Sequence, residues 1–131
     1  MAVNRVIPRR DLNHVEAIID GYEDWFTATG VIEDVVDALE ALNMQTALLD
    51  FSGAKMGLYP GDAVEIARFM NSLTQDLLHL VIRLPETGRG QDVIKAFAAE
   101  MSTAGHAVQV YDFRGSARPD FDSPLDGRAT A

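Results

Sequence analysis

Thr46–Phe51, with the sequence TALLDF, is the stretch that decides the fold. It is a short and nearly continuous apolar run, which is typical of a β-strand covered on both faces. Two similar runs follow it, His79–Leu84 (HLVIRL), stopped by Pro85, and Ala107–Phe113 (AVQVYDF). Short apolar strands that alternate with helical segments indicate an α/β fold.

Helical segments separate these three runs. Val31–Leu42 carries an apolar stripe at helical spacing, and Pro60 suits the first turn of a helix that runs to about Leu73. A third helix is expected between the loop 86–90 and Gly105, a natural residue to follow a helix end. Strand–helix–strand units form right-handed crossovers, so we expect the three strands to be mutually parallel.

The N-terminal part allows two interpretations. His14–Asp20 (HVEAIID) and Trp25–Thr29 (WFTAT) resemble two strands around the turn 21–24, and WFTAT is rich in aromatic and β-branched residues. The alternative is a helix, because apolar residues recur at helical spacing with Asp11 as an N-cap; these are Leu12, Val15, Ile19, Tyr22 and Phe26. The hairpin is the preferred interpretation. Val3–Pro8 is a weak extended segment before it.

The predicted fold is therefore α/β, with a mixed, mainly parallel sheet, an N-terminal antiparallel hairpin and helices packed on the sheet. The expected order is β-β-α-β-α-β-α-β, and two-layer or three-layer packing stays open. The domain should span residues 1–113, and residues 114–131 form a tail. We expect Phe121 and Leu125 to pack on the domain or on a neighbouring chain, where arm exchange would produce a homodimer.

Composition limits the classes of function. The 131 residues include 20 Asp and Glu but only 11 Lys and Arg, a net charge of −9, which is the wrong sign for nucleic-acid binding. No Lys or Arg lies between Asp11 and Ala54, so this half is either a solvated surface or a docking surface for a basic protein. The chain has no cysteine, no secretory segment and no apolar run of membrane-spanning length, which suggests a cytoplasmic protein.

Two short motifs resemble a known family. They are Gly30–Val35 (GVIEDV) and Ala47–Ala54 (ALLDFSGA), in which a strand is followed by Asp, an apolar residue, Ser and Gly. Together with the element order, they resemble the STAS superfamily and, within it, the SpoIIAA-like branch, over most of residues 3–113. The resemblance implies a protein-interaction or regulatory module.

One position departs from that family. In its anti-sigma antagonists an Asp-Ser-Ser-Gly turn starts the helix after this strand, and a serine there is phosphorylated. The matching stretch here is Leu58-Tyr59-Pro60-Gly61, which keeps the glycine but has no serine. A phosphate adds about −1.5 to −2 charges, and Pro60 cannot carry one. We therefore expect no serine switch at this helix start.

Catalytic and metal sites are not indicated. His14, His79 and His106 are dispersed and lack helix-spaced carboxylates, so they are interpreted as structural or surface residues. Ser52 follows a strand, with Asp50 two residues earlier, but no nucleophile-elbow pattern surrounds it. The carboxylates of the Val31–Leu42 segment are interpreted as a solvated face or a partner surface; they are Glu33, Asp34, Asp37 and Glu40.

Two further sequence patterns are weaker indications of a ligand-binding site. In the turn 86–90 (ETGRG) the glycines and Arg89 could hold an anion at a helix start, but a plain strand-to-helix turn is the preferred interpretation. Methionine and aromatic side chains could line an apolar pocket or simply fill the core; they are Met44, Met56, Met70, Met101, Phe69, Phe97 and Trp25.

The sequence predicts a regulatory or protein-interaction module without cofactor, metal or catalytic residues. Its working surface is expected around the loop from Ser52 to Asp62, at the carboxyl ends of the strands, where open α/β sheets bind their ligands. The alternative is a binder of a small apolar or lipid-like ligand. The candidate partner-binding or ligand-binding residues are Asp50, Ser52, Tyr59, Pro60, Gly61, Asp62 and Arg89.

Overall fold

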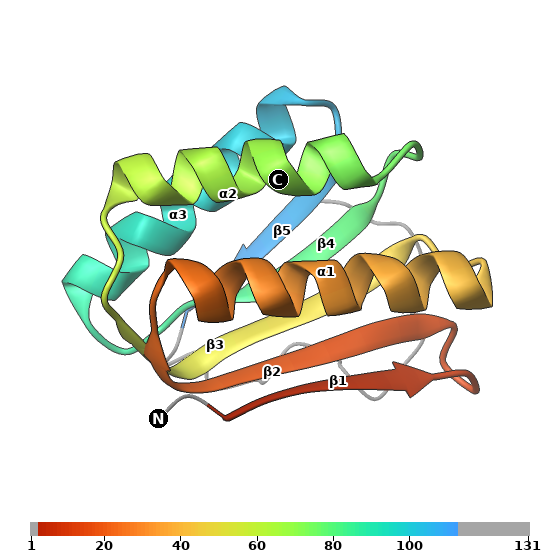
Figure 1. Ribbon diagram of the computed structural model, residues 1–131, viewed down its shortest axis with the longest axis horizontal. Coiled ribbons are helices and arrows are strands. Elements are labelled where there is room, and N and C mark those ends of the chain that lie inside the picture. Colours follow the sequence, from red (N-terminus) through yellow and green to blue (C-terminus); the bar gives the residue numbers. More distant parts are fainter. Residues whose placement is uncertain (1–2, 113–131) are drawn as a thin grey trace.

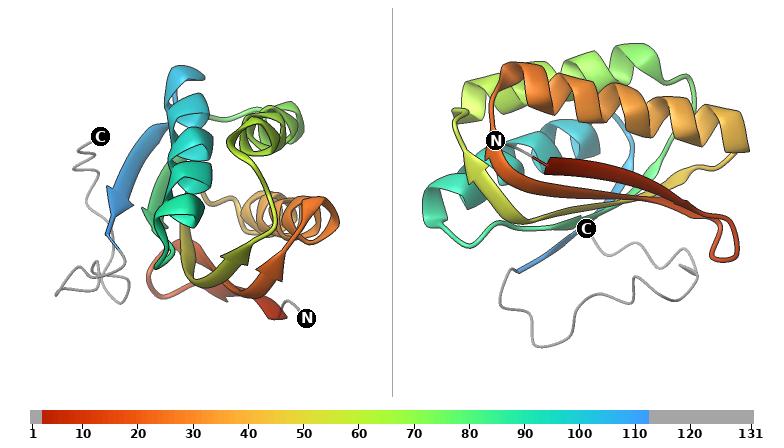
Figure 2. Two further views of the ribbon diagram at one scale, coloured as in Figure 1. Left: turned by 90° about the vertical axis from the view of Figure 1, so that its left-hand side faces the viewer. Right: turned by 60° about the horizontal axis from the view of Figure 1, so that its bottom comes forward.

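The computed structural model describes residues 3–112, which form one sheet of five strands in the order β1-β2-β3-β4-β5. The three helices all lie on one side of this sheet, so the molecule has two layers (Figure 1 and Figure 2). Residues 1–2 and 113–131 lie outside the described part, and the predictions for the tail, Phe121 and Leu125 lie there with them.

The elements follow one another in the predicted order of types. The strands are β1 (Val3–Arg9), β2 (His14–Glu23), β3 (Thr46–Met56), β4 (His79–Arg83) and β5 (Ala107–Tyr111). The helices are α1 (Trp25–Leu42), α2 (Pro60–Leu73) and α3 (Gly88–Thr103). β1 is antiparallel to β2, whereas β2, β3, β4 and β5 pair in parallel. The predicted mixed sheet and the parallel pairing of the three apolar runs are confirmed.

The N-terminal hairpin exists, but different segments form it. The weak extended segment at the N-terminus is β1 and pairs with β2, which includes His14–Asp20. The prediction that Trp25–Thr29 is a strand was wrong, because this segment is the first turn and a half of α1. Asp24 caps that helix: its Oδ1 accepts a hydrogen bond from Thr27 N at 2.9 Å, and Thr27 Oγ1 accepts one from Asp24 N at 2.9 Å. Capping outweighs the strand propensity of WFTAT.

The earlier helix start moves the acidic residues along α1. Because α1 begins at Trp25 and not at Val31, Glu33 and Asp34 lie in the middle of the helix rather than in its first turn. They are exposed, as are Asp37 and Glu40. The helix ends at Leu42, and its cap, Asn43, takes the left-handed conformation with φ of 53°.

Strand β3 is longer than predicted. The segment expected as a loop from Ser52 is strand as far as Met56, because it pairs with the second half of β2 beyond a register shift between Ile18 and Asp20. The connection to α2 is therefore only residues 57–59, and α2 begins at Pro60 as predicted. A short connection holds the start of α2 close to the end of β3.

The hydrophobic core lies between the helices and one face of the sheet. It contains the inward side chains of the central strands and the apolar stripes of all three helices. The sequence left two-layer or three-layer packing open, and no helix of residues 3–112 covers the other face of the sheet (Figure 2). Leu48 and Val81 are nevertheless buried there, and Tyr111 packs against them.

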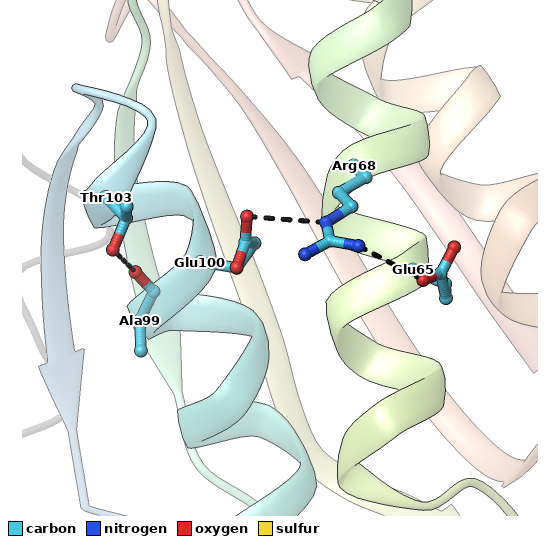
Figure 3. Close-up of polar contacts among 5 residues, drawn as sticks. All are labelled: Glu65, Arg68, Ala99, Glu100 and Thr103. Carbon is cyan, nitrogen blue, oxygen red and sulfur yellow. Dashed lines mark hydrogen bonds and ion pairs between the residues drawn. The ribbon is translucent and has the colours of Figure 1, made fainter.

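A polar bridge joins two helices above the core. Arg68 of α2 contacts Glu65 of its own helix (Nη1–Oε1, 3.3 Å) and Glu100 of α3 (Nε–Oε2, 3.7 Å), as Figure 3 shows. Thr103 Oγ1 donates to Ala99 O near the end of α3. The Arg68 side chain is largely exposed, so such a bridge contributes at most about 1 kcal/mol and mainly orients α2 on α3.

Candidate functional site

The carboxyl edge of the sheet gathers the candidate site. β2, β3 and β4 are parallel, so their carboxyl ends meet at one edge, and each leads directly into the start of a helix. The starts of α1, α2 and α3 accordingly lie together on the left of Figure 1. Side chains from three distant parts of the sequence therefore share this edge.

The start of α1 places two large aromatic side chains in solvent. Because Asp24 is the N-cap, Trp25 and Phe26 are the first two residues of the helix, before its buried stripe begins at Ala28. Trp25 is 41% exposed and Phe26 is 82% exposed. Large apolar side chains that are exposed next to one another indicate an interaction site, whereas singly scattered ones do not.

Four predicted site residues lie at the start of α2, and a fifth, from α3, contacts one of them. Tyr59 is the N-cap, Pro60 is the first helical residue and Gly61 follows it. Asp62 Oδ2 accepts a hydrogen bond from Tyr59 N at 2.9 Å. Arg89, near the start of α3, lies over the Tyr59 ring with its guanidinium carbon 4.8 Å from the ring centroid, within the range of a cation–π contact.

The exposed aromatic residues of this edge form what we call the aromatic edge, consisting of Tyr22, Trp25, Phe26 and Tyr59. Tyr22 is 52% exposed and Tyr59 66% exposed. In residues 3–112 only two other large apolar side chains are comparably exposed, Leu77 and Val110. The aromatic edge is therefore a local concentration rather than part of a generally apolar surface.

A buried carboxyl group lies beneath the aromatic edge. Glu23, the last residue of β2, is only 1% exposed. Asn4 Nδ2 donates a long hydrogen bond of 3.4 Å to Glu23 Oε2, while Oε1 has no hydrogen-bond partner in the described part of the chain. Burial raises the pKa of Glu23; hydrogen bonds with the Asn4 and Thr27 side chains oppose that rise, and the nearby Asp24 adds slightly to it. The protein thus keeps an ionisable group in an environment that disfavours its charge.

Glu23 is the polar member of a cavity wall. The cavity has a volume of about 30 Å³, is partly open to solvent, and lies between the carboxyl edge and the three helices. Its other lining residues are apolar: Ala28, Val31, Ile32, Phe51, Met56, Leu58, Ala63, Ile66, Val93, Ile94 and Phe97. A water molecule needs roughly 10–15 Å³ and two to four polar partners, so the space suits one small group but the lining does not suit water.

Close backbone packing fixes the edge around this cavity. Gly57 N donates to Glu23 O at 2.8 Å, which ties the loop after β3 to the end of β2. A Cβ at Gly57 would clash with the Tyr22 hydroxyl and would lie 2.9 Å from Glu23 O. A Cβ at Gly90 would lie 2.9 Å from Pro85 and 3.3 Å from Met56. Glycine is required at both positions because the chains approach so closely.

Two predicted site residues lie away from this edge. Asp50 is inside β3 opposite Arg83 of β4, and its Oδ1 accepts a hydrogen bond from Ser52 N at 3.0 Å. Ser52 is also within β3, four residues before its end. The structure therefore groups Tyr59, Pro60, Gly61, Asp62 and Arg89 at the carboxyl edge but gives Asp50 and Ser52 a place within the sheet.

The predicted apolar pocket is formed in part. Met56 and Phe97 line the Glu23 cavity, whereas Met70 and Met101 are fully buried in the core. Met44 instead lines a second hollow, of about 170 Å³, at the amino edge of the sheet; the hollow also contains Val36, Leu39, Glu40, Asn43, Thr74, Asp76 and Leu78. Trp25 is a surface residue and not part of a pocket.

Asn4 and Glu23 were not predicted as site residues. Glu23 was placed in a turn and Asn4 in a weak extended segment, and nothing in their spacing indicates burial. A signal for the exposed aromatic residues was present: Asp24 and Thr27 have the spacing of a capping box, which would have placed Trp25 and Phe26 at a helix start.

Comparison of the chain with protein-family models and with curated proteins gives no match. Within residues 3–112, no helix is both long and apolar enough to cross a membrane. The same residues contain no group of three or more His, Cys, Asp or Glu side chains placed to hold a metal ion.

Proposed function

We propose that this protein is a non-catalytic interaction module that binds a basic protein partner at the carboxyl edge of its sheet. The observation that carries the proposal is the aromatic edge, where Tyr22, Trp25, Phe26 and Tyr59 are exposed around three helix starts. Tryptophan and tyrosine are enriched among the residues that dominate binding energy at protein interfaces.

The charge around the aromatic edge favours a basic partner. Asp20 and Asp24 flank Tyr22, Trp25 and Phe26 in the sequence, and no Lys or Arg occurs between Asp11 and Ala54. Acidic side chains beside aromatic rings attract Lys and Arg both electrostatically and through cation–π contacts. Arg89 on Tyr59 already displays such a contact within the chain.

The resemblance to SpoIIAA-like members of the STAS superfamily belongs to the same proposal. The order of strands and helices and the position of the α2 start support it, since the anti-sigma antagonists use the corresponding helix start for regulation. Tyr59 and Pro60 occupy that start here. We therefore propose a regulatory module that works without a serine switch. A cytoplasmic location and a homodimer are further proposals, which rest on sequence alone.

Site-specific crosslinking tests the docking surface. A photo-crosslinking amino acid is introduced at Phe26 and, as a matched control, at Leu77, which is similarly exposed but lies before β4 at the amino edge. We expect one partner protein to crosslink from position 26 and not from position 77. With that partner purified, Phe26→Ser should weaken binding at least about tenfold and Leu77→Ser should leave it unchanged. Equal crosslinking from both positions, or binding unaffected by Phe26→Ser, contradicts the proposal.

A second candidate is a small apolar ligand, and the Glu23 cavity is the observation that favours it. At about 30 Å³ the cavity is far smaller than a typical ligand pocket, so Met56 and Leu58 would have to move apart. Native mass spectrometry of the freshly purified protein separates the two candidates. Retained ligand mass supports the small molecule, and its absence supports the interaction module.

A further inference from the structure

We infer that the face of the sheet opposite the helices binds the C-terminal segment of the same chain, residues 113–131. We call this side of the sheet the open face. Its central row of side chains comes from the four parallel strands, which pair in register there, and consists of Glu16, Leu48, Val81 and Gln109. The open face is a different surface from the aromatic edge, so the inference does not depend on the proposed function.

The first argument is the burial of this row. Leu48 and Val81 are 0% exposed, Glu16 is 4% exposed and Gln109 is 8% exposed. The residues before and after each of them point to the other side of the sheet, because side chains alternate along a strand. Neighbouring strands therefore shield the row only from its sides. A sheet face in contact with water keeps its side chains partly exposed, and glutamate is seldom buried, so the open face must have a cover.

The second argument is which part of the chain can provide this cover. All three helices lie on the other side of the sheet (Figure 2), and the structure contains a single chain, so no second copy produces the burial. Residues 1–2 precede β1, which is three positions from β4 in the sheet. Two residues reach about 7 Å, whereas three strand spacings amount to about 14 Å. The segment that remains is residues 113–131.

The third argument is where that segment starts and how far it reaches. β5 is an edge strand, and its last residue, Tyr111, packs against Leu48 and Val81 on the open face. The segment therefore leaves the sheet at the rim of the surface that needs a cover. Fully extended, it would span roughly 60 Å, while three strand spacings, from β5 to β2, are about 14 Å.

The fourth argument is the composition of the segment. It contains two large apolar side chains close together, Phe121 and Leu125, and two prolines near them, which disfavour a continuous helix. Apolar side chains in an extended segment match a sheet face whose centre is also apolar. In the proposed arrangement Phe121 and Leu125 therefore cover Leu48 and Val81.

The test measures the exposure of methyl groups in the full-length protein by NMR. A soluble paramagnetic reagent is added, and the relaxation of the Leu48 and Val81 methyl signals is compared with that of Leu77, which is 65% exposed. We expect Leu48 and Val81 to be protected from the reagent. The double variant Phe121→Ser, Leu125→Ser removes the apolar contacts of the segment, so the paramagnetic relaxation of both methyl signals should rise severalfold and approach that of Leu77.

The matched control is the double variant Ser116→Ala, Ser123→Ala, which changes two polar side chains of the same segment and should leave the protection unchanged. The Ile82 methyl groups lie on the helix side of the sheet and should stay protected in both variants, which shows that the sheet is intact. Exposed methyl groups in the central row of the wild type would overturn the inference. Protection that persists in the serine variant would overturn it as well.

A spin label distinguishes the same chain from a second copy and does not depend on the stability of the serine variant. Because the chain has no cysteine, Ser123→Cys provides a single attachment site. In isotope-labelled chains that carry the spin label, we expect the Leu48 and Val81 methyl signals to broaden more strongly than those of Val35, which lies in α1. No such difference contradicts the inference. Broadening that appears only when isotope-labelled chains are mixed with separate spin-labelled chains assigns the cover to a second copy and also contradicts it.

Discussion

Glu23 and His106 are both buried ionisable residues, and they lie at opposite edges of the sheet. Glu23 ends β2 at the carboxyl edge, and one of its oxygens lacks a partner. His106 precedes β5 at the amino edge; its Nδ1 accepts from Leu78 N at 2.9 Å, and its Nε2 bonds Asn71 Oδ1 at 2.7 Å. A buried polar group whose hydrogen bonds are all made stabilises the fold, whereas a buried polar group without a partner costs free energy. His106 thus contributes to stability at the amino edge, whereas Glu23 belongs to the edge at which we propose that a partner binds.

Removing His106 should have the largest effect. His106→Ala leaves the Leu78 N–H without an acceptor and Asn71 without a donor, and it opens a cavity among α2, β4 and β5. We expect the free energy of unfolding to fall by about 3 kcal/mol, measured by urea denaturation. His79→Ala is the control, because His79 is only half-buried and its Nε2 bonds Gln109 Oε1 at 2.9 Å; it should cost less than about 1 kcal/mol. Equal losses would contradict the assignment.

The pH dependence of His106 provides a second measurement on the same residue. Burial lowers the pKa of His106 below its ordinary value of 6.5, and the neutral ring accepts through Nδ1. A histidine with a depressed pKa contributes stability that is present above pH 6.5 and is lost as the pH falls through the folded-state pKa. NMR titration of the imidazole should show His106 protonating at lower pH than free histidine.

The next largest effect is expected at the carboxyl edge, from Gly57→Ala. The new methyl group would meet the Tyr22 hydroxyl and Glu23 O, so the loop and the end of β2 must separate. We expect a loss of about 2 kcal/mol in thermal or urea unfolding, together with weaker partner binding. A variant as stable as the wild type would show that this edge is more adaptable than its close packing indicates.

Glu23→Gln should have a smaller effect of the opposite sign. The raised pKa of Glu23 means that its contribution to stability is present below the ordinary value of 4.5 and is lost as the pH rises through the folded-state pKa. Replacing the carboxyl by an amide should therefore stabilise the protein by about 1 kcal/mol at pH 8 and change little at pH 4. Urea unfolding at the two pH values measures the difference. Destabilisation at pH 8 would mean that the carboxylate is already satisfied.

Gly30→Ala should produce the smallest change in the free energy of unfolding, and it serves as a reference for Gly57→Ala. Gly30 is inside α1, and a Cβ there meets nothing within 4 Å. Because alanine favours the helix over glycine, we expect stabilisation by about 0.5–1 kcal/mol in the same unfolding measurement. A loss of stability would show that α1 needs flexibility at this position.

The sequence predicted the parts of the fold that depend on local patterns. The three apolar runs and the Pro60 helix were predictable because each is a continuous stretch with the apolar pattern of a single element type, a buried strand or an amphipathic helix. The hairpin strands were misassigned because the strand propensity of WFTAT competes with one capping aspartate, and the full length of β3 depends on pairing with β2. Propensity and spacing do not contain such non-local information.

The candidate site was predictable only in part, for the same reason. Four of the candidate residues are consecutive in the sequence, namely Tyr59, Pro60, Gly61 and Asp62. Predicting that a helix begins at Pro60 therefore places all four of them at the helix start. Arg89 joins them through the parallel order of β3 and β4. Glu23 and Asn4 come from two strands whose pairing was not predicted, and burial of a polar side chain has no signature in spacing.

The order of the strands in the sheet has a consequence for synthesis. Each strand pairs only with its neighbours along the chain, from β1 to β5. As the chain emerges from the ribosome, every new strand meets a partner that already exists, and no strand waits for one still to be translated. A sheet whose order reverses midway instead grows at both of its edges, because a later strand joins the first one on its other side. The nascent protein can therefore grow its sheet from one side, and the edge that carries Glu23 is complete once β4 and the start of α3 have been made.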